Sequence, residues 1–447
     1  MSALTITWDV ETLARIAQGQ VHGANAVFTS ISTDTRTLQP GALFVALTGP
    51  NFDGHEFVAA AAERGAAAAI VDKVVPGPLP QVVVPDALAG LSTFAREWRR
   101  QFSLPVIAVT GSNGKNTTKE LIGSILSQIG SCLITRGNLN NHIGVPVMLL
   151  ELRPEHRFAV IEMGANHQQE IAHLEGFGSL DGVASGKGEM FRSLPTDGVA
   201  VINADDKYAP LWLDTRSPEC VYTFGFEQQA DFMAHKVRES GNTGAFRIDF
   251  DLVTPVGTKP ATIGLAGLHN LRNALGAAAA SFAAGASIDN IVDGLAAMKK
   301  VSGRLEFKPA IRQAFLVDDS YNANPSSLKA GLDAFRTFQG ERWLVLGEMR
   351  ELGDSSNELH AEVGRYAKQS GVTRMFAIGE GSRFAVKAYG ANAQWFADID
   401  ALIAAVSGDI KPGVAILIKG SRANRLERVS AALADPSAAS SSPSPGH

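Results

Sequence analysis

Apolar residues are grouped along this chain in short continuous runs, and the segments between the runs carry apolar positions at helical spacing. A continuous apolar run bounded by turn residues is typical of a strand buried on both faces, whereas helical spacing favours an amphipathic helix. The runs predict strands at 42–47, 67–71, 105–110, 158–163, 198–203, 220–224, 314–318, 342–346, 373–377 and 413–418. Helices are predicted at 56–65, 117–129, 270–285, 326–337 and 355–370. This alternation predicts an α/β protein whose mostly parallel sheets bind ligands at the carboxyl ends of their strands.

The same pattern divides into three blocks, which we interpret as domains. A small N-terminal α/β domain is predicted over 1–84, ending after the loop of Pro76, Pro78 and Pro80. A central doubly wound domain of P-loop type is predicted over 85–306, and a Rossmann-like α/β domain over 307–434. The tail 435–447 is rich in Ser, Pro and Ala and is predicted to be disordered.

Composition limits the partners and the compartment. The 447 residues are 45% hydrophobic and 19% charged, which is ordinary for a soluble globular protein. The net charge of −5 gives no basic bias toward nucleic acid. Cys132 and Cys220 form no CxxC motif, as expected for isolated thiols in a reducing compartment. The N-terminus lacks the pattern of a signal peptide, and the Ala-rich stretch 274–286 is too short to span a bilayer. A cytoplasmic protein without stable membrane insertion is expected.

The segment 106–118 carries the first candidate chemistry. It is an apolar strand followed by a Gly-rich turn with one lysine, Lys115, and then a helix. Such a turn directs backbone N–H groups and the positive end of the helix dipole at a phosphate. Two positions depart from the general P-loop: Val109 replaces a glycine, and Asn116 replaces the Ser or Thr whose hydroxyl normally holds magnesium. A strand–helix turn without a ligand is the alternative. The predicted cradle residues are Gly111, Ser112, Asn113, Gly114, Lys115, Asn116 and Thr117.

Further strings strengthen the phosphate-site interpretation. They are TRGNLNNHIGVP at 135–146, AVIEMGANH at 159–167, HLEGFGS at 173–179, GKGE at 186–189, DDSYNANP at 318–325, LGEM at 346–349 and IKGSR at 418–422. With the TGSNGK turn, this set resembles the Mur ligases, and among them the branch that adds D-alanyl-D-alanine. The resemblance covers nearly the whole chain, from STDTR at 32–36 to KGSR at 419–422.

The resemblance implies an ATP-dependent ligase with three domains, acting as a monomer on small molecules in peptidoglycan precursor synthesis. The implied substrates are UDP-N-acetylmuramoyl-tripeptide and D-alanyl-D-alanine, joined after ATP converts the tripeptide carboxylate into an acyl phosphate. A free carboxylate resists an amine because it is negatively charged and oxide is a poor leaving group. Phosphoryl transfer removes both obstacles and requires a phosphate cradle, Mg²⁺ and nearby cations.

Site residues follow from the resemblance position by position. Lys115 is expected to neutralise phosphates, and Asn116, Glu162 and His173 to hold Mg²⁺ together with Lys187, the lysine that the family carbamylates. The implied nucleotide contacts beyond the cradle are Asn270, Asn273, Arg304, Asp319 and Asn322, and the implied UDP-substrate contacts are Asp34, Thr35, Arg36, Asn138, Asn140 and Asn141. Each has a non-catalytic alternative: Glu162 as a strand-end carboxylate facing water, Lys187 as a solvated helix lysine, the asparagines as an ordinary turn and Arg36 as a surface ion pair.

Two departures from the family pattern bear on activity. Asn116 stands where the family has Thr, so we predict weaker magnesium binding and a lower rate. The family also separates its Asn-His-Gln segment from HLEGFGS by a helix end, a strand and a loop, whereas here 166–172 runs straight into His173. One strand of the central sheet is therefore predicted to be missing. Two alternatives stay open: a homologue that binds nucleotide or UDP-sugar without turnover, and another amide ligase of the superfamily such as a folylpolyglutamate synthetase.

Overall fold

The computed structural model describes residues 8–49, 52–164, 180–242, 245–298, 303, 306–336, 338, 340–350 and 352–436. The chain forms two compact units. One comprises 1–200, 207–221 and 283–286, and the other 201–206, 222–282 and 287–447. Two predicted site residues, His173 and Arg304, lie outside the described residues, as do most residues of the predicted tail.

The first unit begins with a five-stranded sheet, as expected of a small N-terminal α/β domain. Its order is β1-β7-β6-β3-β2, with β1 antiparallel to β7 and the other neighbours parallel. The bounds are β1 Gln20–His22, β2 Ser30–Ser32, β3 Ala42–Val45, β6 Ala68–Val71 and β7 Gln81–Val83. Strands β3 and β6 are buried along their whole length, which explains their unbroken apolar sequences. The predicted helix at 56–65 is a 3₁₀ turn, Gly54–Phe57, followed by α2, Val58–Glu63.

Helix α3 (Ala87–Arg99) connects this sheet to the next part of the first unit. It packs on α1 (Val10–Ala17) and on α5 (Gly144–Leu149). Trp98 of α3 lies edge-on to Trp8, and its indole N–H donates to the Leu152 carbonyl over 3.1 Å. One apolar core runs from Val10 to Ile161, so the predicted boundary after 84 falls within continuous packing.

The P-loop sheet follows in the same unit. Strands β8 (Val106–Val109), β10 (Phe158–Glu162) and β9 (Cys132–Ile134) are parallel and lie in the order β8-β10-β9. Helix α4 (Lys115–Leu126) packs on β10. Within the described residues β8 is hydrogen-bonded on one side only, to β10.

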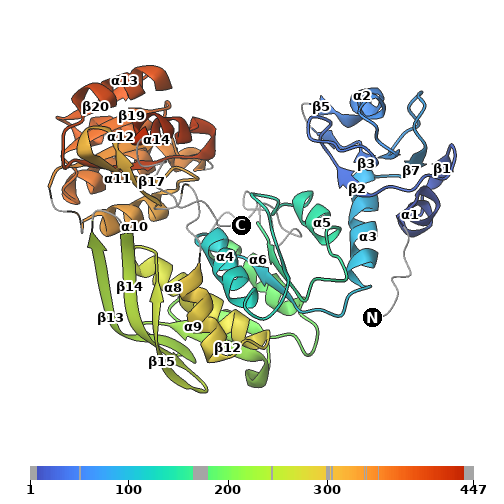
Figure 1. Cartoon of the computed structure of the whole chain (residues 1–447), viewed down its shortest axis with the longest axis horizontal. Coiled ribbons are helices and arrows are strands. Elements are labelled where there is room, and N and C mark those ends of the chain that lie inside the picture. Colours follow the sequence, from blue (N-terminus) through green and yellow to red (C-terminus); the bar gives the residue numbers. More distant parts are fainter. Residues whose placement is uncertain are drawn as a thin grey trace, which may run out of the picture. The chain divides into compact units, whose positions relative to one another are not determined.

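A second central sheet differs from the expectation of one mostly parallel sheet. Its order is β11-β12-β13-β14-β15, and β13, β14 and β15 are antiparallel neighbours. The bounds are β11 Ala200–Asn203, β12 Val221–Gly225, β13 Phe232–Asn242, β14 Ala245–Thr254 and β15 Gly257–Ile263. The three antiparallel strands were not predicted, because charged residues interrupt their apolar positions. Helices α8 (Leu268–Ala283) and α9 (Ile288–Ala297) follow, and α9 packs on β15 (Figure 1).

The C-terminal sheet confirms the Rossmann-like prediction. Its order is β16-β17-β21-β18-β19-β20, with β16 antiparallel at one edge and the other neighbours parallel. The strand bounds are β16 Glu306–Ala310, β17 Ala314–Asp319, β18 Arg342–Gly347, β19 Arg374–Ile378, β20 Ala393–Phe396 and β21 Ala415–Lys419. One apolar core includes residues of α10 (Pro325–Phe335), α11 (Ser356–Gln369) and α12 (Ser382–Tyr389). Another includes residues of α13 (Ile399–Asp409) and α14 (Glu427–Leu433). Figure 1 shows these helices around the C-terminal sheet.

Strand β21 is inserted between β17 and β18, so the carboxyl ends of these three strands meet at a change in strand order. Such a point is where open α/β sheets bind ligands. No helix among the described residues is long and apolar enough to cross a membrane.

Candidate functional site

The P-loop has the strand–turn–helix form that the sequence predicts. Strand β8 ends at Val109, and α4 begins at Lys115 directly after Gly114. Gly114 has φ 80°, a backbone conformation that favours glycine, and it caps α4 without a side chain. The Lys115 ammonium donates to the Gly111 carbonyl over 2.8 Å, so it lies over the loop at the positive end of the helix. The turn can therefore receive phosphates through backbone N–H groups and one lysine.

Glu162 lies at the end of β10, next to this loop, and is completely buried. Its Oε1 accepts hydrogen bonds from Nδ2 of Asn140 over 2.7 Å and Nδ2 of Asn116 over 3.3 Å. The Glu162 backbone N–H donates to Thr135 Oγ1 over 2.9 Å. The alternative of a strand-end carboxylate facing water is therefore wrong. Asn116, at the position of the magnesium-binding hydroxyl, directs its amide at Glu162.

Lys119 is the residue that the sequence interpretation missed. Its side chain is 1% exposed, and its Nζ lies 3.3 Å from Glu162 Oε2 and 3.1 Å from the Gly137 carbonyl, to which it donates. One signal was available. Lys119 follows Lys115 by four residues, so both occupy the same face of α4, and that face begins at the phosphate cradle.

The described residues support a magnesium site that phosphates complete. They contain no group of three or more His, Cys, Asp or Glu side chains that could hold a metal alone. Among them, Glu162 Oε2 is buried and accepts no hydrogen bond, and it faces the Lys119 ammonium at 3.3 Å, so this oxygen already has a cation beside it. Mg²⁺ in phosphoryl-transfer sites is commonly held by one or two carboxylates together with substrate phosphates. One buried carboxylate beside a P-loop fits that donor set.

Lys187, for which the resemblance implies a metal-binding role, contacts the P-loop. It projects from α6 (Leu180–Arg192), and its Nζ donates to Ser112 Oγ in the P-loop over 2.5 Å. Helix α6 is held by Trp212, whose indole N–H donates to the Ala184 carbonyl over 2.9 Å. The alternative of a merely solvated helix lysine is therefore wrong for Lys187.

The three asparagines between β9 and α5 have three different environments. Asn140 donates to Glu162, as described above. Asn141 Oδ1 accepts the backbone N–H groups of Ile143 over 3.2 Å and Gly144 over 2.8 Å, so it supports the start of α5. The side chain of Asn138 is exposed. Asn138 is thus the asparagine of this turn that faces solvent, where a soluble substrate arrives.

The predicted UDP motif follows β2 at the carboxyl edge of the N-terminal sheet. Arg36 Nη2 lies 2.6 Å from Asp34 Oδ2, and their side chains are 85% and 36% exposed. The hydrogen bond from Arg36 holds the pKa of Asp34 below its usual value. An exposed pair of this kind contributes little stability, so both charges remain accessible to a ligand.

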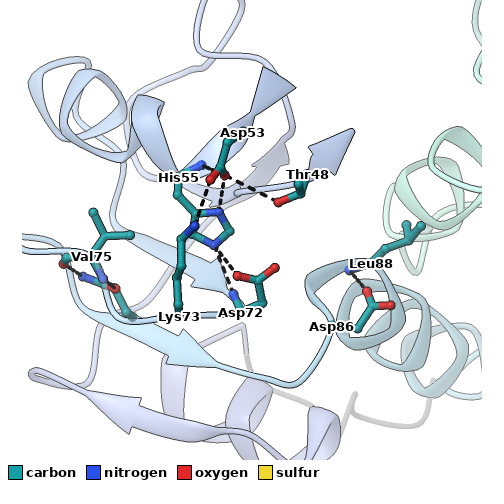
Figure 2. A network of polar contacts seen from close by, with 9 residues as sticks. Thr48, Asp53, His55, Asp72, Lys73, Val75, Asp86 and Leu88 are labelled. Carbon is teal, nitrogen blue, oxygen red and sulfur yellow. Dashed lines mark hydrogen bonds and ion pairs between the residues drawn. The ribbon is translucent and has the colours of Figure 1, made fainter. Parts of the chain in front are cut away.

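A buried histidine lies at the same edge and was not predicted (Figure 2). His55 Nδ1 is 2.5 Å from Asp53 Oδ1, and His55 Nε2 is 2.8 Å from Asp72 Oδ1. Lys73 Nζ lies 2.8 Å from Asp53 Oδ2. Since Asp72 follows β6 and Asp53 ends β5 (Phe52–Asp53), His55 joins the hairpin of β4 (Thr48–Gly49) and β5 to the sheet.

The other predicted nucleotide contacts belong to the second unit. Asn270 is buried near the start of α8, where its Nδ2 donates to the Ala266 carbonyl over 2.8 Å and its Oδ1 accepts from Asn273 over 3.2 Å. Asp319, at the end of β17, pairs with Lys419 at the end of β21 over 2.6 Å. The Asn322 carbonyl accepts from the same lysine over 3.0 Å.

Lys419 therefore joins the ends of β17 and β21 at the change in strand order of the C-terminal sheet. The sequence interpretation assigned it no role. Its place after four apolar residues of a strand was the available signal. Within the second unit, the charges of Asp319 and Lys419 also act on His269 at the start of α8.

Family models match most of the chain. The model described as "Mur ligase family, catalytic domain" matches residues 27–88, and the "Mur ligase middle domain" matches 109–172 and 170–281. The "Mur ligase, glutamate ligase domain" matches 303–422. The two stretches of the middle-domain match meet at 170–172, where the sequence predicts a missing strand.

Curated relatives match over nearly their whole length. The UDP-N-acetylmuramoyl-tripeptide–D-alanyl-D-alanine ligase of Escherichia coli is 40% identical over 450 residues, covering 96% of this chain and 98% of that protein. The Haemophilus influenzae protein of the same name is 36% identical, with 95% and 97% covered.

Solved structures give the same result. A crystal structure of MurF from Acinetobacter baumannii has a TM-score of 0.85 at 34% identity, covering 96% of this chain and 99% of that one. MurF from Thermotoga maritima in complex with ADP has a TM-score of 0.78 at 25% identity, with 90% and 96% covered. A folylpolyglutamate synthase from Mycobacterium tuberculosis, 16% identical with a TM-score of 0.60, shares the fold alone.

Proposed function

Because the chain belongs to the Mur ligase family, we propose that it is an ATP-dependent ligase that joins D-alanyl-D-alanine to UDP-N-acetylmuramoyl-tripeptide in peptidoglycan precursor synthesis. The observation that carries the proposal is the position of the Lys115 turn and of the buried Glu162 carboxylate, which follow and end two adjacent parallel strands, β8 and β10. A phosphate cradle beside a buried carboxylate supports phosphoryl transfer from ATP.

The chemistry divides among residues of the first unit. Lys115 and the N-terminus of α4 bind and neutralise the phosphates, so that the tripeptide carboxylate can approach the γ-phosphate without repulsion. Glu162, with Asn116, His173 and Lys187, would hold Mg²⁺, which supplies further charge neutralisation during phosphoryl transfer. The acyl phosphate then accepts the amine of D-alanyl-D-alanine, and phosphate leaves.

Carbamylation of Lys187 is part of this proposal. The reaction adds carbon dioxide to the neutral amine, releases one proton and converts a cation into an anion that can reach a metal. The contact of Lys187 with Ser112 supports this role because it brings the amine to the cradle. In ¹³C-bicarbonate, the parent is expected to show a carbamate resonance that Lys187→Arg lacks. A parent spectrum without that resonance would contradict the modification.

The second unit supplies the remaining nucleotide contacts in this proposal. Asn270, Asn273, Asp319 and Asn322, together with Arg304, would contact ATP. Asp34, Thr35 and Arg36 would bind the UDP moiety, and Asn138, Asn140 and Asn141 would serve the sugar side of the same substrate. We expect the protein to act as a monomer in the cytoplasm.

A second candidate is a homologue that binds nucleotide or UDP-sugar without turnover. Two observations favour it: Asn116 donates to Glu162 in place of a metal-binding hydroxyl, and the middle-domain match is broken at 170–172. Site groups displaced by about 1 Å already lose much activity.

Phosphate release from ATP and Mg²⁺ separates the candidates. Release that requires both the tripeptide nucleotide and D-alanyl-D-alanine supports the ligase, and Lys115→Met is expected to abolish it. Lys387→Met, which changes an exposed lysine on α12, is the matched control and is expected to retain parent rates. ADP binding without any release would support the binding-only homologue. Release driven by a folate and glutamate would support the folylpolyglutamate-type alternative.

A further inference from the structure

Lys119 is the one buried lysine in the described part of the first unit, and the proposed function leaves it without a role. Its ammonium contacts two elements besides its own helix: β10 through Glu162 Oε2, and the turn of the three asparagines through the Gly137 carbonyl. The contact with Glu162 is nearly free of solvent, because Lys119 is 1% exposed and Glu162 is 0% exposed, whereas Gly137 lies at an exposed position. Contacts of this kind are strong only when every partner keeps its place.

We propose that Lys119 is a positioning residue that acts as an internal cation on Glu162, limits divalent-metal affinity and fixes the asparagine turn against the ATP cradle. This inference rests on the proposed function for its substrate, but its metal readout does not require turnover.

Lys119 acts on Glu162 through its positive charge. Glu162 accepts Asn116 and Asn140 on Oε1, and Lys119 faces Oε2. A divalent cation approaching Oε2 therefore meets a positive charge already beside that oxygen. Repulsion between charges a few ångströms apart is large where water is excluded. Removing the ammonium while retaining the carboxylate should strengthen metal binding, by at least about tenfold.

Lys119 also holds the turn that carries Asn138, Asn140 and Asn141. The backbone of this turn is tied to α4 through the bond from Lys119 to Gly137, and to β10 through Asn140, whose carbonyl also accepts the Gly164 N–H over 2.6 Å. Loss of the lysine removes one of these two ties, next to the exposed Asn138. Binding of the tripeptide nucleotide should weaken by about tenfold, the size of one charge-assisted hydrogen bond.

The two effects have opposite signs, and this distinguishes positioning from simple structural damage. In Lys119→Met, Mn²⁺ binding in saturating ADP, followed by electron paramagnetic resonance, is expected to tighten at least tenfold. Calorimetric binding of UDP-N-acetylmuramoyl-tripeptide is expected to weaken tenfold in the same variant. Lys119→Arg keeps the charge and should return Mn²⁺ affinity to within about threefold of the parent.

Lys119→Gln is the second neutral variant, because its amide can donate to Glu162 and so helps the chain to fold. It should also bind Mn²⁺ more tightly than the parent, whereas Lys387→Met should match the parent in both assays. Unchanged or weaker Mn²⁺ binding in a folded neutral variant would overturn the inference. If the parent releases no phosphate in any mixture, the proposed function fails, yet the Mn²⁺ comparison still decides the role of Lys119.

Discussion

Breaking the buried ion pair between Asp319 and Lys419 should destabilise the C-terminal sheet strongly. Lys419 Nζ lies 2.6 Å from Asp319 Oδ2, and the two side chains are 3% and 11% exposed. Asp319→Asn removes the negative charge and leaves the lysine charge buried with only the neutral Asn322 carbonyl as a described partner. An uncompensated buried charge of this kind costs about 3–5 kcal/mol.

Hydrogen exchange measured by mass spectrometry on the full chain tests this magnitude. The slowest amides of β17 and β21 should lose protection by roughly a hundredfold to a few thousandfold, since each factor of ten corresponds to about 1.4 kcal/mol. The double variant Asp319→Leu, Lys419→Met replaces the pair by apolar groups of similar size. It should recover most of the protection, because neither charge then has to be buried.

The exposed pair of Glu380 and Arg383 on the same unit is the matched control. Its atoms are 2.8 Å apart, but the side chains are 76% and 50% exposed, so Glu380→Gln should change stability by less than about 1 kcal/mol. The reasoning is refuted if Asp319→Asn leaves the protection of β17 and β21 within tenfold of the parent. It is also refuted if the apolar double variant loses as much hydrogen-exchange protection in β17 and β21 as Asp319→Asn does.

Three further outcomes are expected. Gly144→Ala should lower the thermal midpoint, with a cost of about 1–3 kcal/mol, because its Cβ would lie 2.4 Å from the Leu139 backbone carbon. Burial holds the pKa of His269 below its usual 6.5, so the unfolded chain takes up this proton first as the pH falls. The stability due to His269 is therefore complete above pH 6.5 and lost below it, and His269→Asn should flatten the pH dependence of the midpoint. Trp98→Ala should cost about 3–5 kcal/mol in denaturant unfolding, because its buried indole packs against Trp8 within the core that joins the N-terminal sheet to β10. An unchanged thermal midpoint in Gly144→Ala, an unchanged pH dependence in His269→Asn or an unchanged denaturant midpoint in Trp98→Ala would contradict the respective argument.

The fully buried parallel strands were predictable because both of their faces are buried, whereas the partly buried parallel strands β2, β7, β9 and β20 were not predicted. Every residue of β10, β21 and β3 is buried, and their sequences are correspondingly continuous runs of apolar residues ending at polar ones. The antiparallel strands β13 to β15 gave no such signal. In β15, exposed and buried positions alternate irregularly and a proline stands inside the strand, so local pattern favoured a loop.

The sequence motifs and the predicted strand ends indicated which residues lie at the site, but not the partner of each side chain. Glu162 and the Gly-rich turn lie together because parallel strands bring their carboxyl ends to one edge, and Lys187 contacts that turn from helix α6. The partners of each side chain depend on tertiary packing instead. A lysine within a helix is normally solvated, so the spacing of four residues from Lys115 did not suffice to identify Lys119 as the buried counter-ion of Glu162. Likewise, Asn140 and Asn141 are nearly identical in sequence context, yet one binds a carboxylate and the other supports a helix start.

The predicted loss of a strand concerns residues 166–172, which lie outside the described residues, and it stays a prediction. Strand β8 carries the P-loop and is apolar, yet three of its four residues are only partly buried, whereas all of β10 is buried. Within the described residues β8 and β11 are each the terminal strand of a separate sheet, and the two stretches of the family match meet between them in sequence, at 170–172. An apolar parallel strand without charged residues is poorly suited to an edge, because its unpaired backbone groups need a partner. If the strand is missing as predicted, the same change would alter the support of the P-loop and with it the position of Asn116. Restoring a hydroxyl at residue 116 corrects the metal ligand but not this support, so the two departures have to be weighed as one.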